Sequence, residues 1–144
     1  MLNRKDGLNM TSKVNEAVVC FNDGFNCAQA IFSTYCEEFG LDKQTALQLS
    51  CGFGAGMGRL QETCGAVTGA YMVIGLKCGS DKEKTYALVR EFARLFEDKN
   101  KTTNCRELLG VSLIDGDKRT AAERVRGICP KAVQDAAEIL EQLL

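Results

Sequence analysis

The stretch CGAVTGAYMVIGLKC, residues 64–78, decides the fold. Lys77 is its one charged residue, and small or apolar side chains would cover every side of a helix built from it. A helix that is apolar all round is buried in the middle of a protein. Gly79 follows directly and marks the end of this helix. The sequence therefore predicts an apolar central helix over about residues 64–78, enclosed by other helices.

The segments before this stretch have helical periodicity. Apolar residues recur at the i, i+3, i+4, i+7 spacing before Gly24 and again between Asn26 and Gly40. Asp42 is placed to begin a short helix that reaches about Cys51. No segment keeps up the apolar–polar alternation of a strand, so we predict none.

The C-terminal half contains its own start and stop signals. Two capping boxes, each a serine or threonine followed three residues later by a glutamate, mark helix starts: Ser80 with Glu83, and Thr120 with Glu123. We expect a short helix over residues 105–109, an end at Gly127 to the helix that begins at Thr120, and a separate last helix with Pro130 in its first turn. We therefore predict an all-α, compact multi-helix bundle in which residues 1–144 form a single helical domain.

The composition excludes several classes of function. The chain has no histidine, which excludes Ser–His and Cys–His catalysis and every zinc site that needs imidazole. Its 18 basic and 19 acidic residues give a formal charge of −1, so the charge balance predicts no nucleic-acid partner. Residues 1–7, MLNRKDG, lack the apolar core of a signal peptide, and the apolar residues 64–76 are fewer than the roughly 20 that a membrane span needs. We predict a cytoplasmic protein without a membrane span.

Eight cysteines in a reducing compartment indicate metal binding or thiol chemistry. Four of them lie inside predicted helices or near their carboxyl ends, where buried cysteine is common and a thiolate is disfavoured: Cys20, Cys36, Cys51 and Cys78. We interpret these four as structural.

The other four cysteines each stand at the predicted start of a helix: Cys27, Cys64, Cys105 and Cys129. The unpaired N–H groups of a helix start favour the thiolate, which is both the nucleophile and the metal ligand. The spacings are wide and contain no CxxC pair, so neither a zinc finger nor a ferredoxin pattern is present. These cysteines can form a site only if the folded bundle brings the helix starts together.

Two further residues complete the candidate site, and a glycine-rich segment flanks it. Gly65 lets another backbone approach Cys64, and Arg106, next to Cys105, could balance the charge of a sulfur site. Residues 52–63, GFGAGMGRLQET, match no phosphate-binding motif. We expect this loop to cross closely packed helices or to wrap the thiolate site, where its N–H groups can reach sulfur.

An ordered set of motifs runs along nearly the whole chain: GFNCAQA (24–30), GFGAG (52–56), CGAVTGA (64–70), IGL (74–76), CRELLG (105–110) and Cys129. In this order they resemble the C_GCAxxG_C_C family of redox-active proteins. Four cysteines and a CGAxxG motif are the hallmark of that family, and they match Cys27, Cys64, Cys105 and Cys129. The resemblance implies that these four form one site. Similar domains in iron-bearing fusion proteins favour an iron–sulfur centre.

The leading hypothesis is a redox or electron-transfer protein whose four cysteines bind an iron–sulfur cluster. Three alternatives stay open: a metal-free thiol–disulfide protein or redox sensor, a structural zinc protein with four cysteine ligands, and a helical interaction module with inert cysteines. If the chain is an enzyme, we expect an oxidoreductase. Its partner would be a redox protein that the sequence does not identify, and its apolar stripes could pack within one chain or across a homodimer.

Overall fold

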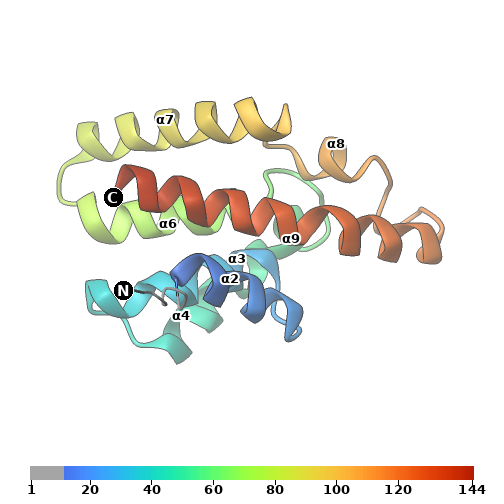
Figure 1. The fold of residues 1–144 in the computed structure, drawn as a ribbon, viewed down its shortest axis with the longest axis horizontal. Helices are drawn as coiled ribbons and strands as arrows, with labels where there is room; N and C mark the ends of the chain where they lie inside the picture. The colour runs from blue at the N-terminus through green and yellow to red at the C-terminus, as the bar shows by residue number, and fades with distance from the viewer. Residues whose placement is uncertain (1–11) are drawn as a thin grey trace, which may run out of the picture.

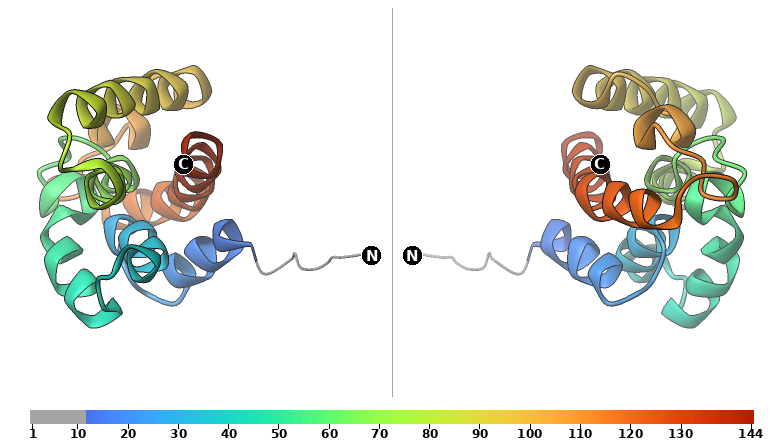
Figure 2. Two further views of the ribbon diagram at one scale, coloured as in Figure 1. Left: turned by 90° about the vertical axis from the view of Figure 1, so that its left-hand side faces the viewer. Right: turned by 90° about the vertical axis from the view of Figure 1, so that its right-hand side faces the viewer.

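The central helix expected over residues 64–78 is α6, Gly65–Cys78, and most of it is buried. The end-on views of Figure 2 show it between α3 (Cys27–Tyr35), α7 (Lys82–Asn100) and α9 (Lys118–Leu143). It contacts all three of these helices. The prediction of an apolar helix in the middle of the bundle is confirmed.

The computed structural model describes residues 12–144, and the polar residues 1–7 lie outside this range. The other elements, in chain order, are α2 (Lys13–Asn22), the 3-10 helix η1 (Cys36–Phe39), α4 (Lys43–Ser50), the 3-10 helix η2 (Cys51–Phe53), α5 (Gly54–Met57) and α8 (Cys105–Leu109). Residues 12–144 contain no strand, so the all-α bundle is confirmed (Figure 1). No helix in this range is both long enough and apolar enough to cross a membrane.

The most extensive helix packing among the described residues is between α3 and α6. A Cβ atom on Gly69 would lie 2.9 Å from the carbonyl oxygen of Ala28 and 3.1 Å from Cβ of Ile31. Glycine at this position therefore allows the two backbones to approach each other. The same approach brings the amino ends of α3 and α6 together, because Gly65 also lies against Cys27 and Ala28.

Two helix starts, at Asn26 and Asp42, agree with the sequence, whereas the starts predicted at Ser80 and Thr120 are both shifted. The N-cap of α9 is Asp117, whose carboxylate accepts the N–H of Thr120, so this helix begins three residues earlier than predicted. Asn26 and Asp42 begin α3 and α4 as expected, each through a side-chain oxygen that accepts a backbone N–H. The long helix α7 begins one residue later than predicted, because its N-cap is Asp81 rather than Ser80. The Asp81 carboxylate accepts the N–H of Lys84 at 3.0 Å, which takes the place of the expected serine cap.

The predicted break between two helices at residues 127–130 is wrong. The structure contains one continuous helix, α9, which begins after Asp117 and passes through both Gly127 and Pro130. The buried face of α9 extends from Ala121 to Leu140 and packs against α2, α7 and α8. Because this packing stabilises the helix on both sides of Pro130, it outweighs the local cost of glycine and proline in a helix interior.

The glycine-rich segment forms an unusual left-handed turn. The five residues from Ala55 to Arg59 all have φ between 56° and 69°, and Gly56 and Gly58 are two of them. L-residues normally avoid this region, at a cost of roughly 1–2 kcal/mol each, whereas glycine adopts it freely. The turn reverses the chain so that the N–H of Glu62 donates to the carbonyl of Gly56 at 2.9 Å. It thereby leads the chain back towards the amino end of α6.

Candidate functional site

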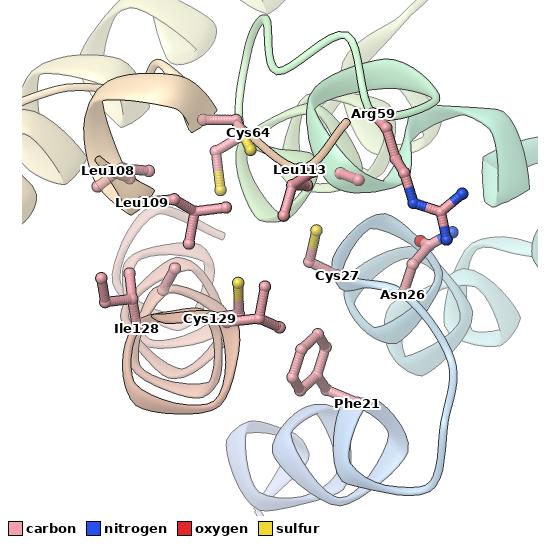
Figure 3. A pocket seen from close by; sticks show the side chains of 15 residues that line it. Phe21, Asn26, Cys27, Arg59, Cys64, Leu108, Leu109, Leu113, Ile128 and Cys129 are labelled. Atoms are coloured by element: carbon pink, nitrogen blue, oxygen red, sulfur yellow. The ribbon is translucent and has the colours of Figure 1, made fainter. Parts of the chain in front are cut away.

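Four cysteines from four different elements line one cavity. Cys27, Cys64, Cys105 and Cys129 share it with mostly apolar side chains, and its volume is about 230 Å³. In Figure 3 the sulfur atoms of Cys27, Cys64 and Cys129 point into the same central space. Side chains that are widely separated in the sequence therefore face one another in the fold.

Three of the four cysteines stand at helix starts, as the sequence predicted. Cys27 is the first residue of α3, Cys64 is the N-cap of α6, and Cys105 is the first residue of α8. Cys129 does not, because α9 is continuous and places it in the middle of the helix. This fourth cysteine reaches the cavity from the side of α9 rather than from a helix end.

Gly65 explains how Cys27 and Cys64 come together. A Cβ atom on Gly65 would overlap Cys27 Sγ, and it would lie 3.0 Å from the carbonyl oxygen of Phe53 and 3.1 Å from the amide nitrogen of Ala28. Only glycine therefore leaves room for the Cys27 sulfur at the start of α6. Gly65 also lines the cavity, so it forms part of the cavity wall.

A short antiparallel pairing fixes Cys64 beside Cys105. Thr63 and Asn104 form an isolated β-bridge. The N–H of Cys64 donates to the carbonyl of Thr103 at 2.7 Å, and the N–H of Cys105 donates to the carbonyl of Glu62 at 2.7 Å. The backbone, and not only side-chain packing, therefore places these two cysteines.

The left-handed turn covers another side of the site. A Cβ on Gly54 would collide with the Asn26 side chain, and a Cβ on Gly56 would lie 2.7 Å from Cβ of Cys105. Ala55, between these glycines, lines the cavity. The expectation that the glycine-rich segment lies against the thiol site agrees with these contacts.

Cys27 is the most acidic thiol of the four. A hydrogen bond from the Cys64 thiol, together with the N–H groups of Ala55 and Ala28, lowers the pKa of Cys27 from 9.0 to about 6, although burial opposes this shift. The same hydrogen bond and burial raise the pKa of Cys64 well above its ordinary value. The two shifts have opposite directions, so the first proton to leave the pair leaves from Cys27.

The remaining two thiols stay protonated. Burial, with the charge of Cys27 nearby, raises the pKa of Cys105 to about 11 and that of Cys129 to about 12. A side-chain hydrogen bond from Gln61 partly offsets this rise at Cys105. In the metal-free protein the site thus contains one thiolate and three thiols.

Arginine lies at this site, but at a position other than the one we expected. Arg106 is exposed and is not among the residues that line the cavity. Arg59 lines it instead, and Figure 3 shows its guanidinium beside Asn26. Its place in the glycine-rich segment was the only sequence signal for this role. Gln61, which lowers the pKa of Cys105, lies in the same segment and had no other sequence signal.

The four cysteines interpreted as structural do not line the cavity: Cys20, Cys36, Cys51 and Cys78. Cys36 and Cys78 are buried and Cys20 is partly buried, whereas Cys51 is exposed. The eight cysteines therefore divide into the same two groups of four that their positions on the predicted helices suggested.

The spacing of the four sulfurs bears on which metal group the site could hold. Within residues 12–144, no group of three or more cysteine or carboxylate side chains is arranged so that it could hold a metal ion. The four cysteines instead surround a cavity. The sulfur ligands of a zinc ion all lie within about 2.3 Å of one point, and the four cysteines are not arranged in that way.

Comparison with known proteins agrees with the four-cysteine pattern. A family model described as "Putative redox-active protein (C_GCAxxG_C_C)" matches residues 25–143. Searches of curated proteins and of solved structures found no match to this chain.

Proposed function

Because this chain belongs to the C_GCAxxG_C_C family of redox-active proteins, we propose that its four-cysteine cavity is a redox centre that binds an iron–sulfur cluster. One observation above all supports the proposal: Cys27, Cys64, Cys105 and Cys129 line the same cavity although four separate elements supply them. Four cysteine thiolates are the usual ligands of [2Fe–2S] and [4Fe–4S] clusters.

The size of the cavity favours a cluster over a single ion. A cavity of about 230 Å³ that is lined by four cysteines and mostly apolar side chains has room for a group of several atoms. A cluster would fill this space, whereas a zinc ion would require the sulfurs to converge further.

The chain contributes ligands, hydrogen bonds and exclusion of water. The four cysteines would supply the thiolates, and a bound cluster would supply one-electron transfer. The N–H groups of Ala28 and Ala55 already donate to Cys27, and those of Ala66 and Val67 donate to Cys64. Such donors stabilise negative charge on sulfur and tune the reduction potential. The apolar lining, which includes Leu109 and Ile128, limits the access of water.

The decisive experiment is anaerobic purification followed by determination of iron, sulfide and zinc per chain. We expect iron and sulfide in comparable amounts and an absorption band near roughly 400 nm from sulfur-to-iron charge transfer. Serine at any one of the four site cysteines should lower the iron content, whereas serine at Cys51, which is exposed and outside the cavity, should not. Zinc without sulfide would support the structural zinc alternative, and a colourless, metal-free protein would exclude the cluster.

The hydrogen bond between Cys27 and Cys64 favours a second candidate, a metal-free dithiol. The Cys27 thiolate would attack a substrate disulfide, form a mixed disulfide and release one thiolate, which takes up the Cys64 proton. The Cys64 sulfur would then attack Cys27 Sγ and release the second thiolate. The substrate disulfide is thereby reduced by two electrons, and Cys27 and Cys64 are oxidised to a disulfide.

Peptide mapping separates the two candidates. Oxidation of the metal-free protein with oxidised glutathione should give a Cys27–Cys64 disulfide if the dithiol is the functional centre. A protein that contains no iron and forms no such disulfide would favour a helical interaction module with inert cysteines.

Either redox function would suit the reducing cytoplasm and would make any enzyme activity that of an oxidoreductase. A redox partner protein and a homodimer both remain predictions.

A further inference from the structure

Gln61 is a buried polar residue in a strained backbone conformation. Only 5% of it is exposed, and its φ is +58°, in the left-handed region that non-glycine residues rarely adopt. A buried amide must find hydrogen-bond partners, because an unsatisfied one costs stability. The hydrogen-bond partners of Gln61 therefore indicate the role of its side chain.

The Gln61 amide joins two distant parts of the chain. Its Nε2 donates to the carbonyl of Val111 at 2.9 Å, and its Oε1 accepts the N–H of Leu113 at 2.7 Å. It also lies close enough to the Cys105 thiol to lower the pKa of that thiol. An amide nitrogen has two hydrogens, so one Nε2 can serve both Val111 and the sulfur.

The segment 110–117, which connects α8 to α9, depends on these bonds for its position. Its two ends bond to the flanking helices, because the N–H of Gly110 donates to the carbonyl of Arg106 and the Asp117 carboxylate accepts the N–H of Thr120. Between these ends the other hydrogen bonds are local: the Ser112 hydroxyl accepts the N–H groups of Ile114 and Asp115, and the carbonyl of Ser112 accepts the N–H of Gly116. Among residues 12–144, the hydrogen bonds that tie Val111–Asp115 to the rest of the protein both end on Gln61.

This segment forms part of the wall of the four-cysteine cavity. Leu113 lines the cavity and is partly exposed, and Figure 3 shows its side chain at the cavity beside Cys27 and Leu109. From these contacts we infer that Gln61 is a positioning residue that holds segment 110–117 closed over the four-cysteine cavity and ties the position of this wall to Cys105. The inference goes beyond the proposed redox function and does not require a bound cluster.

The first test uses the unaltered protein, reduced and metal-free. Amide hydrogen exchange should be slower at Leu113, which donates to Gln61, than at Ile114, which donates only to a hydroxyl of its own segment. Equal exchange at the two amides would show that Gln61 does not hold the segment and would overturn the inference.

The second test opens the cavity by substitution. Gln61→Ala removes the amide, and Gln61→Gly removes it while relieving the strain of a positive φ, which guards against loss of the fold. We expect iodoacetamide to label Cys105 and Cys129 about tenfold faster in both variants, because the two hydrogen bonds to segment 110–117, which each contribute about a factor of three, are lost. Exposed Cys51 serves as the internal reference, and Gln48→Ala, at an exposed position of α4, is the matched control.

A third variant separates the two ends of the side chain. Gln61→Glu keeps an oxygen that accepts the Leu113 N–H but removes the donor to Val111 and Cys105. Amide hydrogen exchange at Leu113 should therefore stay slow, while the rate at which iodoacetamide labels Cys105 changes. Labelling rates and exchange that match the unaltered protein in all three variants would refute the role of Gln61. Because every measurement uses metal-free protein, a failure of the cluster proposal would leave this result unaffected.

Discussion

At the scale of single residues, Gly65 determines whether the site can form. Its missing side chain leaves the space that Cys27 Sγ occupies, and the neighbouring carbonyl of Phe53 and amide of Ala28 prevent a larger residue from turning elsewhere. The first glycine of the CGAxxG motif is therefore required for a steric reason, because Cys27 Sγ packs directly against it.

Substitution of Gly65 tests this reason, with a control in the same helix. Gly65→Ala should destabilise the protein by about 1–3 kcal/mol through overpacking and should lower iron retention, because Cys27 is displaced. Gly75→Ala, where an added Cβ meets nothing within 4 Å, should instead stabilise it by about 0.5–1 kcal/mol. Urea unfolding and iron analysis measure both. Equal stability of the two variants would contradict the steric role of Gly65.

The ionisation of Cys27 gives a second prediction at this scale. In metal-free, reduced protein, alkylation of Cys27 should reach half its maximal rate near pH 6, because its pKa is lowered to about 6. Cys64→Ala removes the main hydrogen-bond donor and should move this midpoint to higher pH. Because the folded-state pKa of Cys27 is lowered from 9.0, its ionisation stabilises the fold fully above about pH 9, and this contribution is lost as the pH falls towards 6. An unchanged midpoint in Cys64→Ala would refute the shared proton.

At the scale of elements, α9 is the helix that the sequence describes least well. Gly127 and Pro130 are local stop signals, yet the helix continues because residues on both sides of them pack against the bundle. Local signals were sufficient for α3 and α4, whose caps Asn26 and Asp42 bond within their own helices. Sequence reasoning failed where long-range packing opposes a local preference.

Since α9 continues through Gly127 without any packing need for glycine there, Gly127→Ala should stabilise it. An added Cβ would meet nothing within 4 Å, and alanine lowers the entropy of the unfolded chain. We expect a gain of about 0.5–1 kcal/mol and a rise in Tm of about 1–4 °C. Gly110→Ala is the opposite control, because its φ of +71° should make alanine destabilising there. Thermal unfolding followed by circular dichroism checks both, and a lower Tm for Gly127→Ala would argue against a continuous α9.

At the scale of the whole molecule, the sequence indicated the four cysteines that share the cavity but placed the arginine wrongly and did not give the geometry. Helix-start positions selected Cys27, Cys64 and Cys105 for a physical reason that the structure retains. Cys129 was selected for a helix start that does not exist, yet it lines the same cavity. The contacts of Gln61 with the segment after α8, about fifty positions away, depend on the tertiary fold and leave no local pattern.

The cavity between the four cysteines also makes the protein sensitive to hydrostatic pressure. Unfolding eliminates internal voids and lowers the molar volume, typically by about 20–100 mL/mol, so compression favours the unfolded chain. In metal-free, reduced protein, Ala132→Leu should fill part of the cavity that Ala132 lines and should make the volume change of unfolding smaller. High-pressure NMR would measure that change directly, and an equal value in both proteins would mean that the space is not a void in solution. The volume change of unfolding would thus report on the free space between the four cysteines without any redox chemistry.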